Sequence, residues 1–322
     1  MTTAARDLPG VGTLFAAPHA AVEDLRPGDY AYYGIPYDLS SDGLAGARHG
    51  PLACRDASQY YAVFRPSFEE ITTARVIDFP ETIDLGDAPV FPLDWDESRG
   101  RLSAWITDIL ARGAVPVGIG GDYFATSAFA PAFAATVTAR GGTPAFLRLS
   151  GRLDLGDEHP SLGVLWHGRT TRTIVESNAF DATRVTLFGA NDYIPDGDWT
   201  FAKASGVQVF PLHEIRATGP ATALRQAIDV MGVDPRDVYV SIDIDVVDGA
   251  YAPNTDEPVF DGLTNVELLG IADILNERRF GALDVTGINP HVEPSSITAA
   301  RFAAWLILRL TGRQRPLEAN RA

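Results

Sequence analysis

The chain has 322 residues, and its 42 Asp and Glu residues against 26 Lys and Arg residues give it a formal net charge of −16. A surface this acidic repels phosphate backbones and anionic lipid headgroups, which excludes a role on nucleic acid or at a membrane surface. An apolar share of 46% with 10% aromatic residues excludes a disordered chain. The single cysteine, Cys54, excludes a cysteine-rich zinc or iron–sulfur site.

Strands and helices are predicted to alternate along the chain. Apolar runs of strand length predict strands over residues 30–36, 114–119, 144–149, 184–188, 207–210, 238–244 and 281–288. Helical periodicity between most of these runs predicts helices over residues 51–64, 94–111, 124–139, 170–177, 221–231, 265–276 and 296–310. This alternation is typical of right-handed βαβ units. We therefore predict an α/β fold, a three-layer α/β/α sandwich with a mainly parallel central sheet.

The sequence contains no linker that would divide it. We predict a single domain over residues 1–322, with loosely held ends at about 1–25 and 313–322. No apolar stretch is long enough to span a membrane, and the N-terminus has no basic segment followed by an apolar run. We therefore expect a soluble, cytoplasmic protein.

Polar segments follow four of the predicted strands at their carboxyl ends, over residues 120–123, 150–154, 243–248 and 289–291. Ligands of open α/β sheets bind at this edge. Asp243 and Asp245 give the strongest indication of a site, because two residues of a strand that lie two apart point to the same face. Two neighbouring carboxylates repel each other unless a metal ion, an arginine or a cationic ligand lies between them. Aspartates that merely cap a loop are the structural alternative.

Several motifs in order resemble the ureohydrolase superfamily, which includes arginase, agmatinase and formimidoylglutamase. They are GIPYD at 34–38, GARHGPLACRDAS at 46–58, IDLGD at 83–87, SIDIDVVDGAYAP at 241–253, GLTNVE at 262–267 and the closing SSITAARFAAWLILRL. The resemblance covers nearly the whole chain and implies an arginase-like fold. It also implies assembly into trimers or hexamers, and hydrolysis of a guanidino or amidino carbon by hydroxide bridging two manganese ions.

The six metal ligands that the resemblance implies fall on Tyr123, Ser150, Arg152, Asp154, Asp243 and Asp245. Only the three aspartates keep a ligating residue type. Arg152 would place a permanent charge where an ion should lie, and a guanidinium offers hydrogen-bond donors only. We therefore predict that the two-manganese centre is degenerate and that Arg152 bridges to Asp243 or Asp245. We expect no cofactor, although three aspartates leave room for a single Mn²⁺, Mg²⁺ or Ca²⁺ ion.

Other candidate residues surround this edge of the sheet. His167 resembles the family's His-Gly turn and can transfer protons near neutral pH, although a surface histidine without a role is the alternative. Tyr123 is either a proton donor or a packing replacement for histidine, and His159 follows the altered turn. The family's substrate-binding glutamate falls on Val292, one residue before Glu293, so guanidino recognition is shifted or lost. The candidate substrate-binding residues are Ser150, His159, Asn289, His291 and Glu293.

Three functions remain open from the sequence. The first is an enzyme that acts on a small cationic or amine-bearing, amino-acid-derived molecule without the two-manganese centre. Its catalytic residues would be Asp154, Asp243, Asp245, Arg152, Tyr123 and His167. The second is a non-catalytic homologue that serves as a binding or assembly partner. The third is a C–N hydrolase with one metal ion. We favour the first, because a site without any role should drift toward apolar packing.

Overall fold

A computed structural model describes residues 12–71, 73–191 and 193–317 of the chain. The strands in this part are β1 (Tyr30–Ile35), β2 (Ser67–Glu70), β3 (Arg75–Asp78), β4 (Thr82–Asp87), β5 (Val115–Gly120), β6 (Ala145–Leu149), β7 (Val185–Ala190), β8 (Gln208–Pro211), β9 (Val238–Asp243), β10 (Ala282–Thr286) and β11 (Arg313–Pro316). The α-helices are α1 (Gly50–Ala62), α2 (Trp95–Ala111), α3 (Thr126–Ala139), α4 (Thr170–Glu176), α5 (Asp196–Ser205), α6 (Leu212–Thr218), α7 (Pro220–Met231), α8 (Asn265–Arg278) and α9 (Thr298–Thr311).

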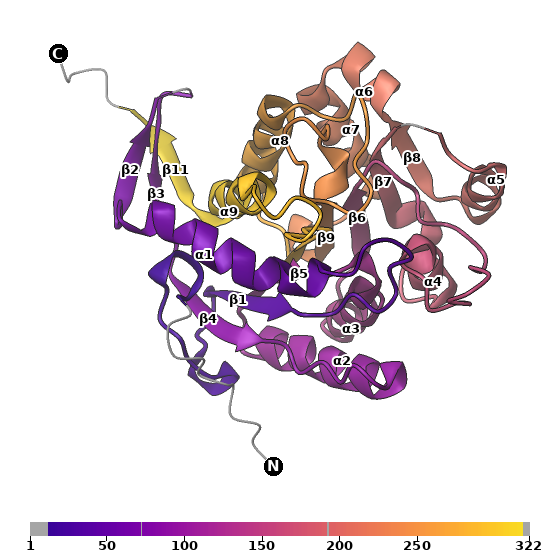
Figure 1. Ribbon diagram of the computed structural model, residues 1–322, viewed down its shortest axis with the longest axis horizontal. Helices are drawn as coiled ribbons and strands as arrows, with labels where there is room; N and C mark the ends of the chain where they lie inside the picture. Colours follow the sequence, from indigo (N-terminus) through magenta and orange to yellow (C-terminus); the bar gives the residue numbers. More distant parts are fainter. Residues whose placement is uncertain (1–11, 72, 192, 318–322) are drawn as a thin grey trace.

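Eight strands form the central sheet in the order β4-β1-β5-β10-β9-β6-β7-β8. Every pair of neighbours in this sheet is parallel, and Tyr30 of β1 for example lies opposite Val115 of β5. Parallel strands need crossover connections, which the intervening helices provide (Figure 1). The central strands β6 and β9 are buried along their whole length, as their nearly continuous apolar runs predicted.

Two hydrophobic clusters lie on the two faces of the sheet. One face packs against apolar side chains of α1, α6, α7, α8 and α9, and the other against those of α2, α3, α4 and α5. Alternation along a strand divides its side chains between these clusters, so that Tyr32 of β1 belongs to the first cluster and Tyr33 to the second. The predicted three-layer α/β/α architecture is confirmed.

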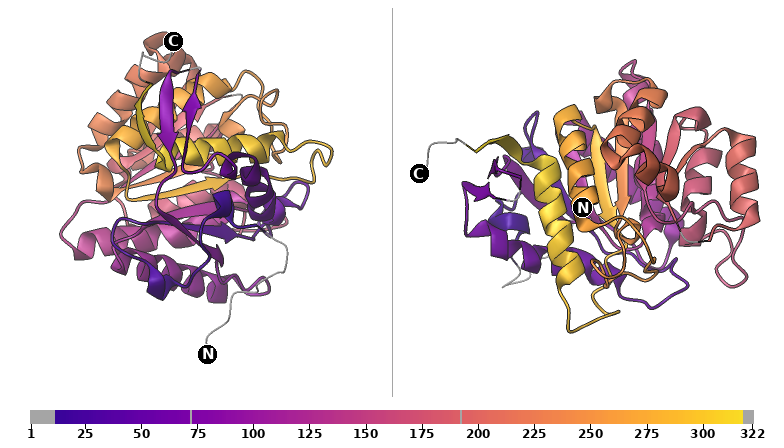
Figure 2. Two further views of the ribbon diagram at one scale, coloured as in Figure 1. Left: turned by 90° about the vertical axis from the view of Figure 1, so that its left-hand side faces the viewer. Right: turned by 90° about the horizontal axis from the view of Figure 1, so that it is seen from above.

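A second, antiparallel sheet has the strand order β11-β3-β2 and was not predicted. It lies beside α1 and α9 at one end of the molecule, where Phe68 of β2 packs against Trp305 of α9 (Figures 1 and 2). The predicted loose ends are held by the fold at several described residues, whereas residues 1–11 and 318–322 lie outside the part of the chain that the structure describes. Leu14 and Phe15 are buried, and their backbone N–H groups donate to Asp84 and Ser58. Residues 313–316 pair with β3.

The loop after β5 shows how tightly the carboxyl edge of the sheet is built. A Cβ atom on Gly121 would lie 1.9 Å from the carbonyl oxygen of Tyr37 and 2.6 Å from that of Ile35. Only glycine therefore fits where this loop crosses the end of β1, and the fit fixes the position of the following residues Asp122 and Tyr123.

None of the helices in the described residues is long and apolar enough to cross a membrane. That residues 1–322 form one domain stays a prediction.

Candidate functional site at the carboxyl edge of the sheet

A small cavity of about 20 Å³ lies at the carboxyl edge of the central sheet. It is lined by Asp122, Tyr123, Arg148, Asp154, His167, Asp243, Asp245, Thr255, Asp256, Glu257 and Gly287. The structure thus brings together five of the six residues that we proposed as catalytic, and Arg152 is the exception. A cavity of this volume holds about one water molecule.

Arg148 is the cation at the centre of this site. It belongs to β6, and its side chain points to the same face of the sheet as that of Phe146, in the cluster with α2 and α3. Only 2% of Arg148 is exposed. Its Nη2 atom forms an ion pair with Asp154, lies 3.6 Å from Oδ2 of Asp243, and donates to Oγ of Ser150 at 3.1 Å.

The guanidinium of Arg148 lies over the ring of Tyr123, 3.2 Å from its centroid. Burial alone would lower the pKa of Arg148, but Tyr123 and the neighbouring aspartates raise it above its ordinary value. Arg148 is therefore charged at neutral pH. Its Nε and Nη1 atoms have no hydrogen-bond partner among the described residues. A buried guanidinium with free donors can donate to a further oxygen atom, of water or of a ligand.

Our prediction that Arg152 bridges to Asp243 or Asp245 is wrong. Nε of Arg152 instead lies 3.0 Å from Oε2 of Glu257, and a quarter of the Arg152 side chain is exposed. The reason is its place in the chain: Arg152 follows β6 in a loop, where its backbone N–H donates to Ser150. Arg148 reaches the aspartates because it lies within the strand itself, and it supplies the compensating charge that we had assigned to Arg152.

Asp243 and Asp245 differ in their surroundings. Oδ2 of Asp243 accepts from Thr286 and its Oδ1 accepts from the backbone N–H of Asp245, both at 3.2 Å. Oδ1 of Asp245 accepts from Ser150 at 3.0 Å and from the N–H of Gly151 at 3.2 Å. Burial raises the pKa of Asp245 well above its ordinary value, and the charge of Asp243 adds to the shift. Arg148 therefore offsets only part of the carboxylate charge here.

His167 forms the rim of the cavity. Its Nε2 lies 2.9 Å from Oδ1 of Asp42. Burial would lower the pKa of His167, but the bond to Asp42 and the charges of Glu257, Asp122 and Asp154 raise it to about 9. His167 is thus a cation near neutral pH. Asp42, His167 and Glu257 also offer three ligand atoms within 4.8 Å of one another, a group that could hold a metal ion only after His167 has lost its proton.

His159 lies beside this rim without completing a metal site. Its Nε2 is 3.5 Å from Oδ2 of Asp42, and its Nδ1 accepts from the backbone N–H groups of Ser161 and Leu162 at 3.2 and 3.3 Å. An Nδ1 atom that accepts two N–H groups carries a lone pair, so the proton of the neutral ring lies on Nε2. His159 therefore presents a donor to Asp42.

Tyr123 is buried, and its hydroxyl lies 3.2 Å from that of Thr171. Burial raises the pKa of Tyr123 above its usual range, so the phenol stays protonated at neutral pH. Its ring faces the guanidinium of Arg148. Of the two roles considered for Tyr123, the packing role is the one that this arrangement supports, since the ring stabilises a buried cation through its π face.

Asn289, His291 and Glu293 do not line the cavity. Nδ2 of Asn289 donates to the carbonyl of Leu44 and to Asp256, so it reaches the site only through Asp256. The ring of His291 stacks on that of His49, with centroids 4.8 Å apart. Glu293 is exposed. The carboxylates that line this side of the cavity are Asp256 and Glu257, which we did not predict.

The residues that sequence reasoning missed are Arg148, Asp122, Asp42, Asp256 and Glu257. Arg148 carried a signal, because an arginine in a strand buried on both faces needs charged partners. Asp122 stands in the glycine-rich turn that we did identify; burial raises its pKa to about 6 although Ser40 and Phe124 donate hydrogen bonds to it. The other three lie in loops whose fold the sequence does not reveal.

Comparisons with known proteins cover most of the chain. Residues 28–312 match the model of the arginase family. The chain is 30% identical to a guanidinopropionase of Pseudomonas aeruginosa over 268 residues, 83% of this chain and 80% of that protein. It is 27% identical to an agmatinase of Escherichia coli, over 85% of this chain and 84% of the relative. A proclavaminate amidino hydrolase from Streptomyces clavuligerus has a similar structure, with a TM-score of 0.78, 25% identity, and coverage of 94% of this chain and 96% of that one.

Proposed function

The chain belongs to the arginase family, and from this premise we propose that it is an enzyme that binds a small cationic compound, bearing an amine or a guanidine, at the carboxyl edge of the sheet. We propose further that it acts on this compound without a pair of manganese ions. The observation that carries the proposal is the buried Arg148, placed among Asp154, Asp243 and Asp245 with too little positive charge to balance them.

The charge balance of the cavity supports a cationic ligand. Six carboxyl groups line it, Asp122, Asp154, Asp243, Asp245, Asp256 and Glu257, against two cations, Arg148 and the protonated His167. Burial raises the pKa of four of these carboxyl groups, Asp122, Asp245, Asp256 and Glu257. Burial disfavours the charged form of a carboxyl group, and a bound amine or guanidine would favour it again by supplying positive charge. The names of the relatives, guanidinopropionase and agmatinase, indicate compounds of this kind.

The residues present do not fit the two manganese ions that the family resemblance implies. Three of the six matching positions hold Tyr123, Ser150 and Arg152, and the guanidinium of Arg148 already contacts Asp154 and Asp243. A guanidinium repels a metal ion and offers it no lone pair. An ion held by Asp154, Asp243 and Asp245 would first have to displace Arg148 from two of them.

The remaining residues offer an acid and several bases for work on a bound compound. His167, with its pKa of about 9, is protonated at neutral pH and can donate a proton at Nε2 once it leaves Asp42. The carboxyl groups of Asp154 and Asp243 line the same cavity and offer oxygen atoms that can accept one.

A second candidate is a non-catalytic homologue that binds or assembles with another molecule. The observation in its favour is the cavity volume of about 20 Å³, which leaves space for about one water molecule beside the ion pairs of Arg148. Catalysis on an amine or guanidine would require the rim formed by Asp42, His167 and Glu257 to open.

Measurements of ligand binding and of turnover on the same protein distinguish the enzyme from the non-catalytic homologue. Purified full-length protein is titrated with guanidinopropionate and agmatine in a calorimeter, and release of urea and ammonia is followed with and without EDTA. We expect saturable binding of a cationic compound and turnover that EDTA does not abolish. Asp243→Asn should remove both, and Asp248→Asn, which changes an aspartate five residues on that is outside the cavity, should remove neither.

Each other outcome contradicts the proposal in a definite way. Turnover that is strictly manganese-dependent would mean that a metal centre forms despite Arg148. Binding without turnover would favour the non-catalytic homologue, and so would the absence of both.

A further inference from the structure

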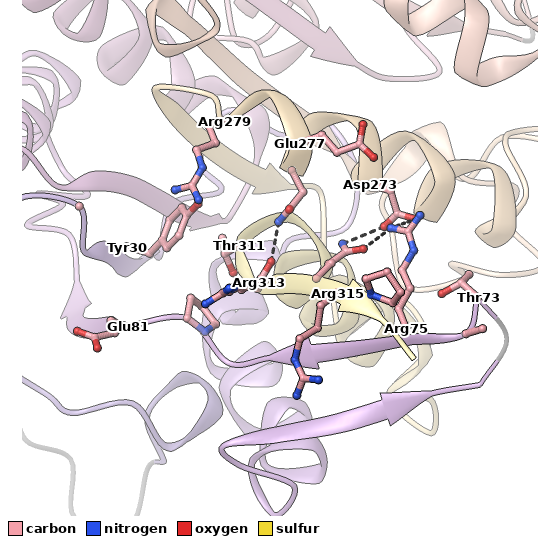
Figure 3. A pocket seen from close by; sticks show the side chains of 17 residues that line it. Tyr30, Thr73, Arg75, Glu81, Asp273, Glu277, Arg279, Thr311, Arg313 and Arg315 are labelled. Atoms are coloured by element: carbon pink, nitrogen blue, oxygen red, sulfur yellow. Dashed lines mark hydrogen bonds and ion pairs between the residues drawn. The ribbon is translucent and has the colours of Figure 1, made fainter. Parts of the chain in front are cut away.

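A groove of about 690 Å³ lies at the opposite edge of the central sheet (Figure 3). Tyr30, the first residue of β1, lines it together with Arg279, which follows α8, and with residues of β3 and β11. Because the strands of the central sheet are parallel, this edge holds their amino ends and the candidate site lies at the other. The groove separates the small antiparallel sheet from the C-terminal end of α8, and its volume suits a small organic ligand.

Arginines dominate the groove although the chain as a whole has a net charge of −16. Four of them line it, Arg75, Arg279, Arg313 and Arg315, and they come from three separate segments of the chain. Arg75 pairs with Asp273 at 3.3 Å, and Arg315 lies 3.4 Å from Asp78. Arg279 and Arg313 are exposed and form no ion pair with any described residue.

The carboxylates that line the groove form ion pairs with other arginines or lie apart from Arg279 and Arg313. Asp273 is bound by Arg309, whose Nε donates to its Oδ1 at 2.8 Å, and also by Arg75. Glu277 lies 3.8 Å from Arg225. In Figure 3 the side chain of Glu81 points away from the arginines of β11, at the far end of the groove. The guanidinium groups of Arg279 and Arg313 therefore form no ion pair within the described residues, although Arg313 lies opposite Asp78 in the pairing of β11 with β3.

The backbone holds Arg279 in an unusual conformation toward this groove. Its φ angle is +57°, a value that a side chain other than glycine or asparagine rarely adopts at the end of a helix. The guanidinium lies beside the ring of Tyr30 (Figure 3). Burial raises the pKa of Tyr30 and the positive charge of Arg279 lowers it, which is consistent with this closeness.

We propose that this groove is a second binding site, specific for a small dianion such as a phosphate-bearing metabolite, which Arg279 and Arg313 hold between them. Guanidinium groups bind phosphate and carboxylate oxygens through pairs of parallel hydrogen bonds. Two exposed arginines from different segments suit a doubly charged ligand better than a single carboxylate. Such a ligand would join β11 to the end of α8 and stabilise the folded protein by mass action.

The proposal is tested by thermal unfolding and calorimetry of the full-length protein with inorganic phosphate, pyrophosphate and succinate. Sodium chloride holds the ionic strength constant and serves as the control. We expect a saturable rise in the melting temperature with at least one of these multivalent anions. The double variant Arg279→Ala/Arg313→Ala should weaken binding at least tenfold. The matched control is Arg278→Ala, which removes the exposed arginine that precedes Arg279 and lies outside the groove, and it should keep the full effect.

Three results would overturn the proposal. The first is a wild-type protein that no dianion stabilises beyond the chloride control. The second is a shift that the double variant retains, which would place the anion elsewhere. The third is a double variant whose oligomeric mass changes while dianions have no effect on either protein, which would make the groove a contact between copies of the chain.

Discussion

The two polar regions at opposite edges of the central sheet use arginine in opposite ways. At the carboxyl edge Arg148 is buried, and its charge is shared among Asp154, Asp243 and the ring of Tyr123. At the amino edge Arg279 and Arg313 are exposed and form no ion pair with any described residue. A buried charge must be compensated within the fold, so changing it disturbs stability first. An exposed charge costs the fold little and remains free for a ligand.

The largest effect should follow from replacing Arg148. In Arg148→Met the aspartates lose their cation, and we expect the free energy of unfolding in urea to fall by about 3–5 kcal/mol. The matched control, Arg152→Met, removes a partly exposed arginine paired with Glu257 and should cost less than about 1 kcal/mol. Equal losses in the two variants would mean that burial does not distinguish them. Added Ca²⁺ or Mn²⁺ should restore part of the stability of Arg148→Met alone.

The next effect concerns His167 and pH. Its pKa is about 9 in the folded protein and 6.5 in the ordinary imidazole, so the pair with Asp42 stabilises the fold fully below pH 6.5. This contribution is lost as the pH rises through 9, and we expect the loss to be of the order of 1–3 kcal/mol. Urea unfolding at pH 6 and pH 9.5 measures it. His167→Gln should flatten the profile in this window, and an unchanged profile would contradict the account.

A smaller effect, of opposite sign, is expected for Asp245. Because burial and Asp243 raise its pKa, the ionised form destabilises the folded state at neutral pH. Asp245→Asn keeps an acceptor for Ser150 and should raise the free energy of unfolding at pH 7 by about 1 kcal/mol, while weakening the binding of a cationic compound. Destabilisation by this variant would show that Arg148 fully compensates the cluster.

The smallest effect belongs to the amino edge. Arg279→Gly relieves the positive φ angle of this residue, and we expect a gain in unfolding free energy of about 0.5–1 kcal/mol. The comparison with Arg279→Ala, which keeps the backbone cost, isolates the contribution of φ. A loss of stability in Arg279→Gly would mean that the Arg279 side chain stabilises the fold and is not free to bind a ligand.

The sequence predicted most strands of the central sheet but not the small antiparallel sheet, for physical reasons. All seven predicted strands overlap strands of the central sheet, because strands buried on both faces require long apolar runs. The small sheet was not predicted, because β2, β3 and β11 have only four residues each and carry several charges. In addition, β11 (residues 313–316) pairs with β3, which lies far from it in the chain. Such pairing leaves no local periodicity.

The same division holds within the candidate site. The rule that ligands bind at the carboxyl ends of strands found Asp154, Asp243 and Asp245, because a position along a strand determines which edge a residue reaches. We assigned the compensating cation to Arg152 in the loop instead of Arg148 in the strand, because the family motif matches the loop. Asp256 and Glu257 depend on how a long loop folds back, which spacing alone does not specify.

We propose that the guanidinium of Arg148, through its contacts with Asp154 and Asp243, keeps a pair of manganese ions from this site. Equilibrium dialysis of the purified protein against Mn²⁺ at neutral pH, followed by elemental analysis, tests it most directly. We predict no stoichiometric manganese in the wild-type protein and measurable uptake in Arg148→Met. Two manganese ions per wild-type chain, lost on replacing Asp154 and Asp243, would contradict the account.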